Sequence, residues 1–187
     1  MTNPYPTLFS APDDQVLRLA AAVRMLVLDV DGVMTDGTVW YGEHGEALKG
    51  FNILDGLGIR LLLREGIEVA ILSARDSPSL RRRAQDLGIT RLSLGAGDKL
   101  TAWEGLLNEA GLNAGESAYA GDDLIDLPVL RKAGLAVTVA NGHPLVAAEC
   151  HWRTARPGGS GAVREICELL LAARGRLEAV FGGYLDG

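Results

Sequence analysis

Met25-Leu-Val-Leu-Asp-Val-Asp-Gly32 indicates a buried strand that runs directly into an acidic turn. The apolar residues 25–28 suit a strand covered on both faces, as strands of parallel sheets are. Asp29 ends the apolar run, and Gly32 permits a tight turn. We therefore expect a parallel sheet with two carboxylates, Asp29 and Asp31, at the carboxyl end of its first strand.

The rest of the chain repeats this pattern of short apolar runs separated by helical segments. Further strands are predicted at 67–72, 92–94, 117–120 and 135–139, and helices at 12–23, 55–64, 78–87, 98–110, 126–133 and 161–174. This alternation predicts an α/β fold, a Rossmann-like three-layer sandwich with a mostly parallel sheet. No break in composition divides the chain, so we expect residues 1–187 to form a single domain.

Two segments depart from the alternation. Residues 38–41 and 46–51 flank Gly42-Glu43-His44-Gly45, which predicts a small β-hairpin insertion over about residues 38–51 with its turn at 42–45. Residues 175–187 show little periodicity and are predicted to form a mobile tail.

The composition is that of an ordinary globular protein, and it excludes several classes of function. Hydrophobic residues make up 48% of the chain and the formal net charge is −6, which argues against disorder and against a nucleic-acid-binding surface. No apolar run reaches the ~18 residues that suggest a membrane span, and the first residues do not resemble a secretory signal. The two cysteines suggest neither a metal site nor a disulfide framework, so we expect a cytoplasmic protein.

Chemically reactive side chains collect where the predicted strands end. In order along the chain they are Asp29 and Asp31, Ser73 and Arg75, Lys99, and Asp122 and Asp123. The carboxyl ends of parallel strands share one edge of the sheet, so these groups are expected to converge on one crevice. Carboxylates crowded there require a cation, and Mg²⁺ prefers such oxygen ligands. With Lys99 and the Ser73 hydroxyl, the set suits phosphoryl transfer, in which a carboxylate can act as nucleophile.

Either acidic pair alone is equally typical of a simple turn after a strand. The occurrence of all these groups in this order is not typical of simple turns. The same residues also resemble the motifs of a known superfamily. Asp29-Val-Asp-Gly-Val-Met-Thr-Asp-Gly37, Ser73, Lys99 and Gly121-Asp-Asp-Leu-Ile-Asp126 resemble the four motifs of the haloacid dehalogenase-like phosphatases. Within that superfamily, residues 20–175 are similar to the phosphatases of 3-deoxy-D-manno-octulosonate 8-phosphate. Segments 49–60, 73–75 and 158–165 extend the match, with Ala74 where that family usually has Gly.

The resemblance implies a role for each residue of the motifs. Asp29 would be the nucleophile and a Mg²⁺ ligand. Asp31 would be the general acid and base, a substrate contact and a Mg²⁺ ligand through its backbone carbonyl. Ser73 and Lys99 would hold the phosphoryl oxygens, and Asp122 would ligate Mg²⁺ with Asp123 and Asp126 nearby. The product would feed lipopolysaccharide synthesis in a Gram-negative bacterium.

The substrate must be recognised without a large cap domain, because only 43 residues separate Asp29 from Ser73. In the resembling family the hairpins join a homotetramer and a neighbouring subunit helps to close the site. Trp40 and Tyr41 of the hairpin suit such an interface, although they could equally pack on their own sheet.

The resemblance also implies a set of residues that bind the sugar acid. They are Asn52, Asp55, Gly56, Arg60, Arg75 and Arg83, with Arg83 reaching a neighbouring subunit's site. Arginine forks suit the carboxylate of a sugar acid. Asp55 could equally be a simple helix N-cap, and Arg81 and Arg82 are expected to lie on a solvated helix face.

Two alternatives remain open. One keeps the mechanism and changes the substrate to a nine-carbon sugar acid 9-phosphate, although relatives with that specificity tend to carry Glu in place of Arg75. The other is a phospho-accepting receiver domain, a signalling module that also places acidic residues and a Lys at strand ends.

Gly158-Gly-Ser-Gly161 lacks the Lys-Ser/Thr of a P-loop, so we expect a close backbone turn there.

Overall fold

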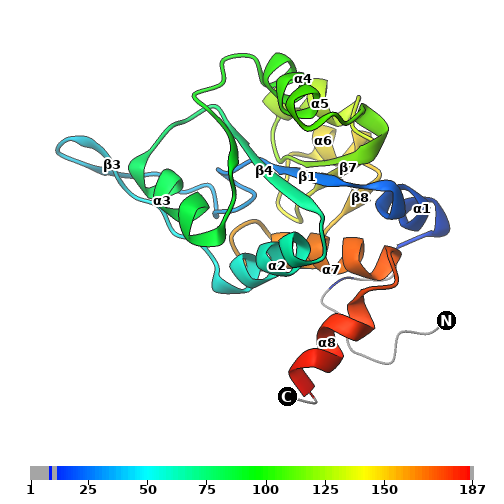
Figure 1. The fold of residues 1–187 in the computed structure, drawn as a ribbon. Coiled ribbons are helices and arrows are strands. Elements are labelled where there is room, and N and C mark those ends of the chain that lie inside the picture. Colours follow the sequence, from blue (N-terminus) through cyan, green and yellow to red (C-terminus); the bar gives the residue numbers. More distant parts are fainter. Residues whose placement is uncertain (1–8, 10–11, 186–187) are drawn as a thin grey trace.

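The computed structural model describes residues 9 and 12–185, which form a six-stranded parallel sheet flanked by helices (Figure 1). The strand order is β5-β4-β1-β6-β7-β8, and every neighbouring pair is parallel. The strands are β1 (Met25–Leu28), β4 (Glu68–Ser73), β5 (Arg91–Leu94), β6 (Ser117–Ala120), β7 (Leu135–Thr138) and β8 (Trp152–Arg153). The expected α/β fold with a mostly parallel sheet is confirmed.

Helices cover both faces of the sheet and make it the middle of three layers. One face carries α1 (Asp14–Ala22), α2 (Ile53–Arg64), α3 (Pro78–Leu87) and α7 (Ala162–Ala173), and α8 (Leu177–Leu185) extends from α7 away from the sheet. The other face carries α4 (Lys99–Ala110), α5 (Leu127–Leu130) and α6 (Pro144–Glu149). Two short 3₁₀ helices, η1 (Ala114–Glu116) and η2 (Leu124–Asp126), flank β6. Strand β1 is buried on both faces, because Leu26 and Leu28 join one apolar cluster and Met25 and Val27 join the other.

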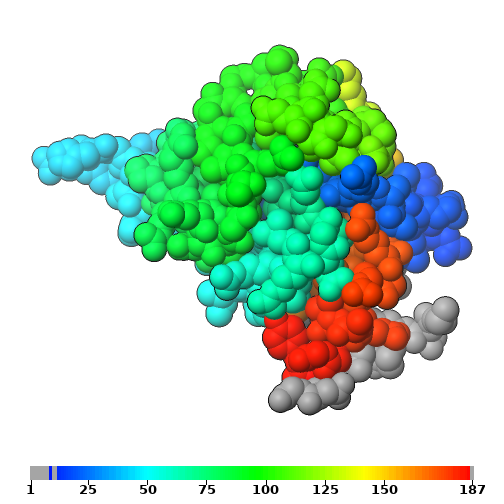
Figure 2. Space-filling model, in the orientation of Figure 1, coloured from blue at the N-terminus to red at the C-terminus, as the bar shows by residue number. Residues whose placement is uncertain are grey.

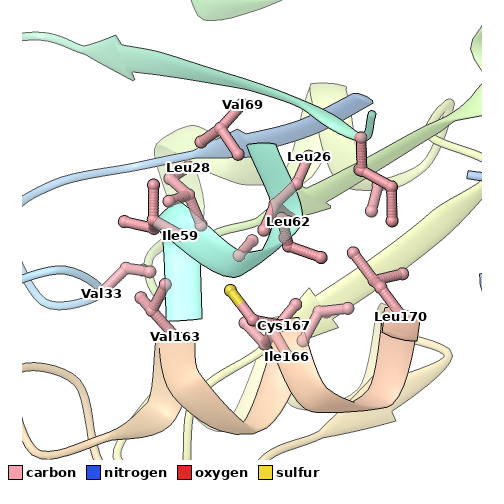
Figure 3. Close-up of a cluster of buried hydrophobic side chains, with 14 of the residues drawn as sticks. Leu26, Leu28, Val33, Ile59, Leu62, Val69, Val163, Ile166, Cys167 and Leu170 are labelled. Atoms are coloured by element: carbon pink, nitrogen blue, oxygen red, sulfur yellow. The ribbon is translucent and has the colours of Figure 1, made fainter. Parts of the chain in front are cut away.

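The most extensive contact between helices of the described residues is that of α2 with α7. Gly58 makes it possible, since a Cβ at this position would lie 2.9 Å from Cδ of Arg164 and 3.1 Å from Cβ of Cys167. Figure 3 shows the layer that results, with side chains from the sheet, α2 and α7 packed together, among them Leu26, Leu28, Ile59, Leu62, Ile166 and Cys167. Such dense packing fixes α2 against the body of the protein.

The hairpin forms a separate two-stranded sheet that projects from the body of the molecule (Figure 2, light blue). It comprises β2 (Trp40–Gly42) and β3 (Gly45–Leu48), and Gly42 pairs with Gly45, so the turn is shorter than the expected 42–45. Trp40 is 58% and Tyr41 70% exposed. They do not pack on their own sheet, which was one of the two possibilities for this pair.

The structure differs from the sequence expectations in three further places. Helix α2 begins at Ile53 and is capped by Asn52, whose side chain accepts from the Leu54 N–H at 2.8 Å, so the interpretation of Asp55 as the cap of this helix was wrong. Helix α6 and strand β8 were not predicted because both are short. Residues 177–185 form helix α8, and the mobility of this tail stays a prediction. No helix in the described residues is both long and apolar enough to cross a membrane.

Candidate active site

The sheet topology brings the reactive strand ends together. Strand β1 lies between β4 and β6, and the chain builds outward to β5 on one side and to β7 and β8 on the other. Such a reversal of strand order opens a crevice at the carboxyl edge. Asp29, Ser73 and Asp122 follow or end these three central strands. The fold therefore brings these strand ends together, and carboxylate oxygens of Asp29 and Asp122 lie within 4.8 Å of each other.

Lys99, at the start of α4, lies inside this acidic cluster. Its Nζ is 2.9 Å from Oδ1 of Asp29 and 2.7 Å from Oδ1 of Asp126, and all three side chains are buried. Asp98 begins the helix by accepting from the N–H groups of Leu100 and Thr101. Burial opposes the charge on Lys99, but the charges of Asp29 and Asp126 outweigh it and raise the pKa of Lys99. The site therefore holds a fixed cation beside Asp29.

Asp126 is completely engaged by the protein. Oδ1 accepts from Lys99 and from the Tyr119 hydroxyl at 2.6 Å, and Oδ2 accepts from the N–H groups of Asp122 and Asp123 at 3.0 and 3.2 Å. Burial, and then the charge of Asp126, raise the pKa of Tyr119 well above its ordinary value, which keeps this phenol a donor. A carboxylate oxygen of Asp126 lies within 4.8 Å of those of Asp29 and Asp122, but both oxygens of Asp126 already accept hydrogen bonds from the protein. Its part is to hold Lys99 and the loop that carries Asp122.

Asp29 and Asp122 are the two carboxylates suited to a metal ion. Burial, reinforced by the charge of Asp126, raises the pKa of Asp29 to about 7 and that of Asp122 to about 6. Two ionised carboxylates in such surroundings need a cation. Gly32 leaves the space for this arrangement, because a Cβ there would lie 2.0 Å from Oδ2 of Asp122. The donor set thus fits Mg²⁺, which takes carboxylate oxygens and keeps several waters.

Asp31 points toward the hairpin side of the site. Its Oδ1 pairs with Nζ of Lys49, and its Oδ2 lies 3.7 Å from Nε of Arg75. Arg75 also donates to the hydroxyl of Tyr41 at 3.5 Å, and its side chain is 48% exposed. Ser73 is buried and its hydroxyl accepts from the Arg75 N–H at 3.1 Å. Arg75 therefore lies at the mouth of the site, beside Asp31 and Ser73.

The other expected substrate ligands lie around the start of α2. Asn52, Asp55, Gly56 and Arg83 pack together with Phe51 and with Met34 of the loop after Asp31, around a gap that leaves no room for a water molecule. The guanidinium of Arg83 lies over the ring of Phe51, 5.8 Å from its centroid, and donates to the Asn52 carbonyl at 3.2 Å. Arg60 lies farther along α2, exposed, in an open hollow shared with Arg64, Leu87 and Gly88. The structure thus brings Arg75 to the acidic cluster and leaves these residues in a second group.

Asp55 caps a helix, but a distant one. Its Oδ1 accepts from the N–H of Arg164 at 2.8 Å, at the start of α7. Burial raises the pKa of Asp55, and hydrogen bonds from the α7 backbone oppose this shift. Gly161, which precedes α7, has no side chain to cap it, so a carboxylate from α2 takes that place.

The glycine run before α7 supports the loop that follows Asp29 with its backbone. The N–H of Gly159 donates to the Val33 carbonyl at 3.0 Å, and a Cβ on Gly158 would lie 1.7 Å from the Gly32 carbonyl oxygen. Only glycine permits this approach. The expected close backbone turn is confirmed.

Two residues of the site escaped the sequence analysis. Tyr119 lies within β6, and the apolar pattern of this strand indicates burial but no hydrogen-bonding role. Lys49 follows an exposed strand, where a lysine side chain is ordinarily solvated. The alternating positions of β6 contained a signal for Tyr119, because a buried tyrosine needs a partner for its hydroxyl. The pairing of Lys49 depends on two loops that are remote in sequence, so no local pattern indicates it.

Comparison with known proteins assigns the chain to a family. A profile described as haloacid dehalogenase-like hydrolase matches residues 88–166. Over 176 residues the chain is 47% identical to the 3-deoxy-D-manno-octulosonate 8-phosphate phosphatase KdsC of Yersinia pestis, with 94% of both chains covered. The corresponding enzyme of Escherichia coli K12 is 45% identical over the same share of both chains.

A solved structure gives the same result. The 3-deoxy-D-manno-octulosonate 8-phosphate phosphatase of Moraxella catarrhalis, in complex with magnesium ion, phosphate ion and a KDO molecule, superposes with a TM-score of 0.89. It is 38% identical, and the match covers 91% of this chain and 98% of that one. With this likeness along nearly its whole length, the chain belongs to the haloacid dehalogenase-like hydrolases, in the family of the 3-deoxy-D-manno-octulosonate 8-phosphate phosphatases.

Proposed function

We propose that this protein is a Mg²⁺-dependent phosphatase that hydrolyses 3-deoxy-D-manno-octulosonate 8-phosphate to the free sugar acid and phosphate. The observation that carries the proposal is the buried pairing of Lys99 with Asp29, next to Asp122, at the carboxyl edge of the sheet. Relatives that share this fold and nearly half of its residues are named for that reaction. Since these relatives are phosphatases, the receiver-domain alternative is not retained.

The reaction divides into two displacements at phosphorus. Asp29 attacks the phosphoryl group, the bond to the sugar oxygen breaks, and Asp31 gives its proton to that oxygen. Asp31 then takes a proton from water, whose oxygen attacks the aspartyl phosphate and releases phosphate and the Asp29 carboxylate. Ser73 and Lys99 hold the phosphoryl oxygens. Mg²⁺, held by Asp29, Asp122 and the backbone carbonyl of Asp31, would neutralise the negative charge of the phosphoryl group.

Arg75 is proposed to select the eight-carbon substrate over the nine-carbon alternative. It is half exposed beside Asp31, so its guanidinium can turn toward the carboxylate or a hydroxyl of the sugar acid. Asn52, Asp55, Gly56, Arg60 and Arg83 remain proposed substrate contacts. Asn52, Asp55, Gly56 and Arg83 form a group apart from the acidic cluster, and Arg60 lies in a separate hollow, so these residues suit a site completed by a neighbouring subunit.

We further propose a homotetramer joined through the hairpin. Trp40, Tyr41 and Leu48 expose apolar surface on an arm that projects from the body (Figure 2), and aromatic side chains are enriched in interfaces. Sedimentation of the active protein should give the mass of four chains, and a monomeric mass with undiminished activity would contradict the assembly. Residues 1–187 would act as one domain in the cytoplasm, supplying the sugar acid for lipopolysaccharide.

A phosphate-release assay tests the proposed activity. The protein would be given the eight-carbon and nine-carbon sugar-acid phosphates, with Mg²⁺ and after exhaustive chelation. We expect the highest kcat/KM for the eight-carbon substrate, loss of turnover on chelation and recovery on adding Mg²⁺. Full activity after chelation would exclude the metal, and a preference for the nine-carbon substrate would exclude the specificity.

A further inference from the structure

The side chain of Lys49 is enclosed at a place where a lysine would ordinarily reach solvent. It directly follows β3, whose last residue, Leu48, is 67% exposed, yet only 3% of the Lys49 side chain is accessible. A buried ammonium is stable only where carboxylates compensate it. Its partners are Oδ1 of Asp31 and Oε1 of Glu46, the latter at 3.5 Å. Lys49 thus connects the base of the hairpin to the loop that carries Asp31.

The two oxygens of Asp31 therefore have different partners. Oδ1 faces Lys49, whose side chain is enclosed and whose Nζ lies 3.5 Å from Oε1 of Glu46 in the hairpin. Oδ2 faces Arg75 at 3.7 Å, whose side chain is 48% exposed and can leave. One oxygen is thus fixed by a buried cation, and the other becomes free once Arg75 turns to a ligand.

We infer that Lys49 is a positioning residue that holds Asp31 by Oδ1, so that Oδ2 faces the reacting oxygen. The inference rests on the proposed role of Asp31 as general acid and base. Proton transfer requires the carboxylate oxygen at hydrogen-bond distance from the attacking water, and an unrestrained aspartate visits that geometry less often. Because Lys49 belongs to the hairpin, it also makes the geometry of Asp31 depend on how the hairpin is seated.

The two half-reactions with p-nitrophenyl phosphate distinguish this role from general damage. The p-nitrophenolate leaving group needs little protonation, so formation of the aspartyl phosphate depends weakly on Asp31. Its hydrolysis depends strongly on Asp31, which must take the proton from water. Loss of positioning should therefore slow the second step far more than the first, whereas a distorted site would slow both.

The experiment compares Lys49→Met with Lys49→Arg and with the matched control Lys132→Met. Lys132 pairs with Glu104 at 2.8 Å on the surface, so the control removes a lysine from a carboxylate outside the site. Rapid-quench measurement in the presence of Mg²⁺ gives the rates at which the phosphoenzyme forms and decays. We expect Lys49→Met to slow the decay at least ~10-fold with little change in formation, Lys49→Arg to restore much of the rate, and the control to match the wild type.

Three outcomes would overturn the inference. Wild-type decay in Lys49→Met would remove Lys49 from this role, and so would equal slowing of both steps. A raised KM for the sugar-acid phosphate with unchanged decay would make Lys49 a substrate ligand instead. If Lys49→Met does not fold, Lys49→Gln is measured in the same way, and wild-type decay there has the same meaning. If the wild-type protein forms no phosphoenzyme, the proposed function itself is refuted. If the wild type forms it and the Lys49 variants break it down at the wild-type rate, only the role of Lys49 is refuted.

Discussion

Nζ of Lys99 lies 2.9 Å from Oδ1 of Asp29, and both side chains are buried. The same ammonium is 2.7 Å from Asp126, which the Tyr119 hydroxyl and two backbone N–H groups hold in place. Lys99 is thus fixed beside the proposed nucleophile by groups of the protein itself. Such preorganisation spares the site from reorganising when charge develops on the phosphoryl group.

The hydrogen bonds of Asp126 with Lys99 and Tyr119 should contribute measurably to the free energy of unfolding. Asp126→Asn replaces an acceptor with an amide, whose NH₂ must face either Lys99 and Tyr119 or the N–H groups of Asp122 and Asp123. We expect a loss of about 3–5 kcal/mol in the free energy of unfolding, as for other broken buried pairs. Tyr119→Phe removes one hydrogen bond to a charged group and should cost about 1.5–3 kcal/mol. Urea unfolding would measure the free energy of unfolding of both variants. Values equal to that of the wild type would show that Asp126 does not have this supporting role.

Gly32→Ala should weaken metal binding specifically. Gly32 has φ +95°, and an added Cβ would lie 2.0 Å from Oδ2 of Asp122. Gly37→Ala is the matched control, because Gly37 has φ +84° and its nearest contact would be 3.6 Å away. Both variants strain the backbone, but only the first displaces a proposed ligand. Calorimetric titration with Mg²⁺ should show an affinity at least ~10-fold lower for Gly32→Ala, and equal affinities would disprove the ligand role of Asp122.

The contact between α2 and α7 predicts a difference between two helical glycines. Gly58→Ala forces a methyl group against Arg164 and Cys167 and should destabilise the protein by about 1–3 kcal/mol. Gly105 lies in α4 with nothing within 4 Å of its added Cβ. There alanine should stabilise the protein by up to about 1 kcal/mol, because it favours the helix. Thermal unfolding midpoints would give the order, and a destabilised Gly105→Ala would contradict it.

Arg75→Ala should lower activity on the sugar-acid phosphate more than activity on a small phosphate ester. We expect kcat/KM for 3-deoxy-D-manno-octulosonate 8-phosphate to fall at least ~10-fold, about 1.4 kcal/mol, with a much smaller loss for p-nitrophenyl phosphate. Arg81→Ala is the control, since Arg81 pairs with Asp76 on the surface. Equal losses on both substrates would place Arg75 in phosphoryl transfer, and no loss on either would leave the eight-carbon preference unsupported.

The central strands and their reactive ends could be predicted because each depends on local pattern. The run 25–28 is apolar on both faces of β1, and Asp29 stops it. The helices predicted at 78–87 and 98–110 agree with α3 and α4, which Ser77 and Asp98 cap. Parallel pairing then places the strand ends at one edge, so the meeting of these side chains follows from the sequence without knowledge of any distance.

The parts that could not be predicted depend on contacts between remote segments. Asn52 and Asp55 are both plausible N-caps, and only the position of α7 decides that Asp55 caps Arg164 rather than its own helix. The side chain of Lys49 is enclosed because the loop carrying Asp31 lies against the hairpin base. Strand β8 has only two residues, Trp152 and Arg153, too few to show a period, and it is defined by pairing with β7.

The residue that becomes phosphorylated during turnover decides whether Asp29 is the nucleophile. The protein would be mixed with 3-deoxy-D-manno-octulosonate 8-phosphate and Mg²⁺, quenched in acid during turnover, and mapped by peptide mass spectrometry. We predict one added phosphoryl group on Asp29, absent in a folded Asp29→Asn variant that releases no phosphate. Phosphate release without any phosphoryl group on Asp29, or near-normal turnover by Asp29→Asn, would contradict the account.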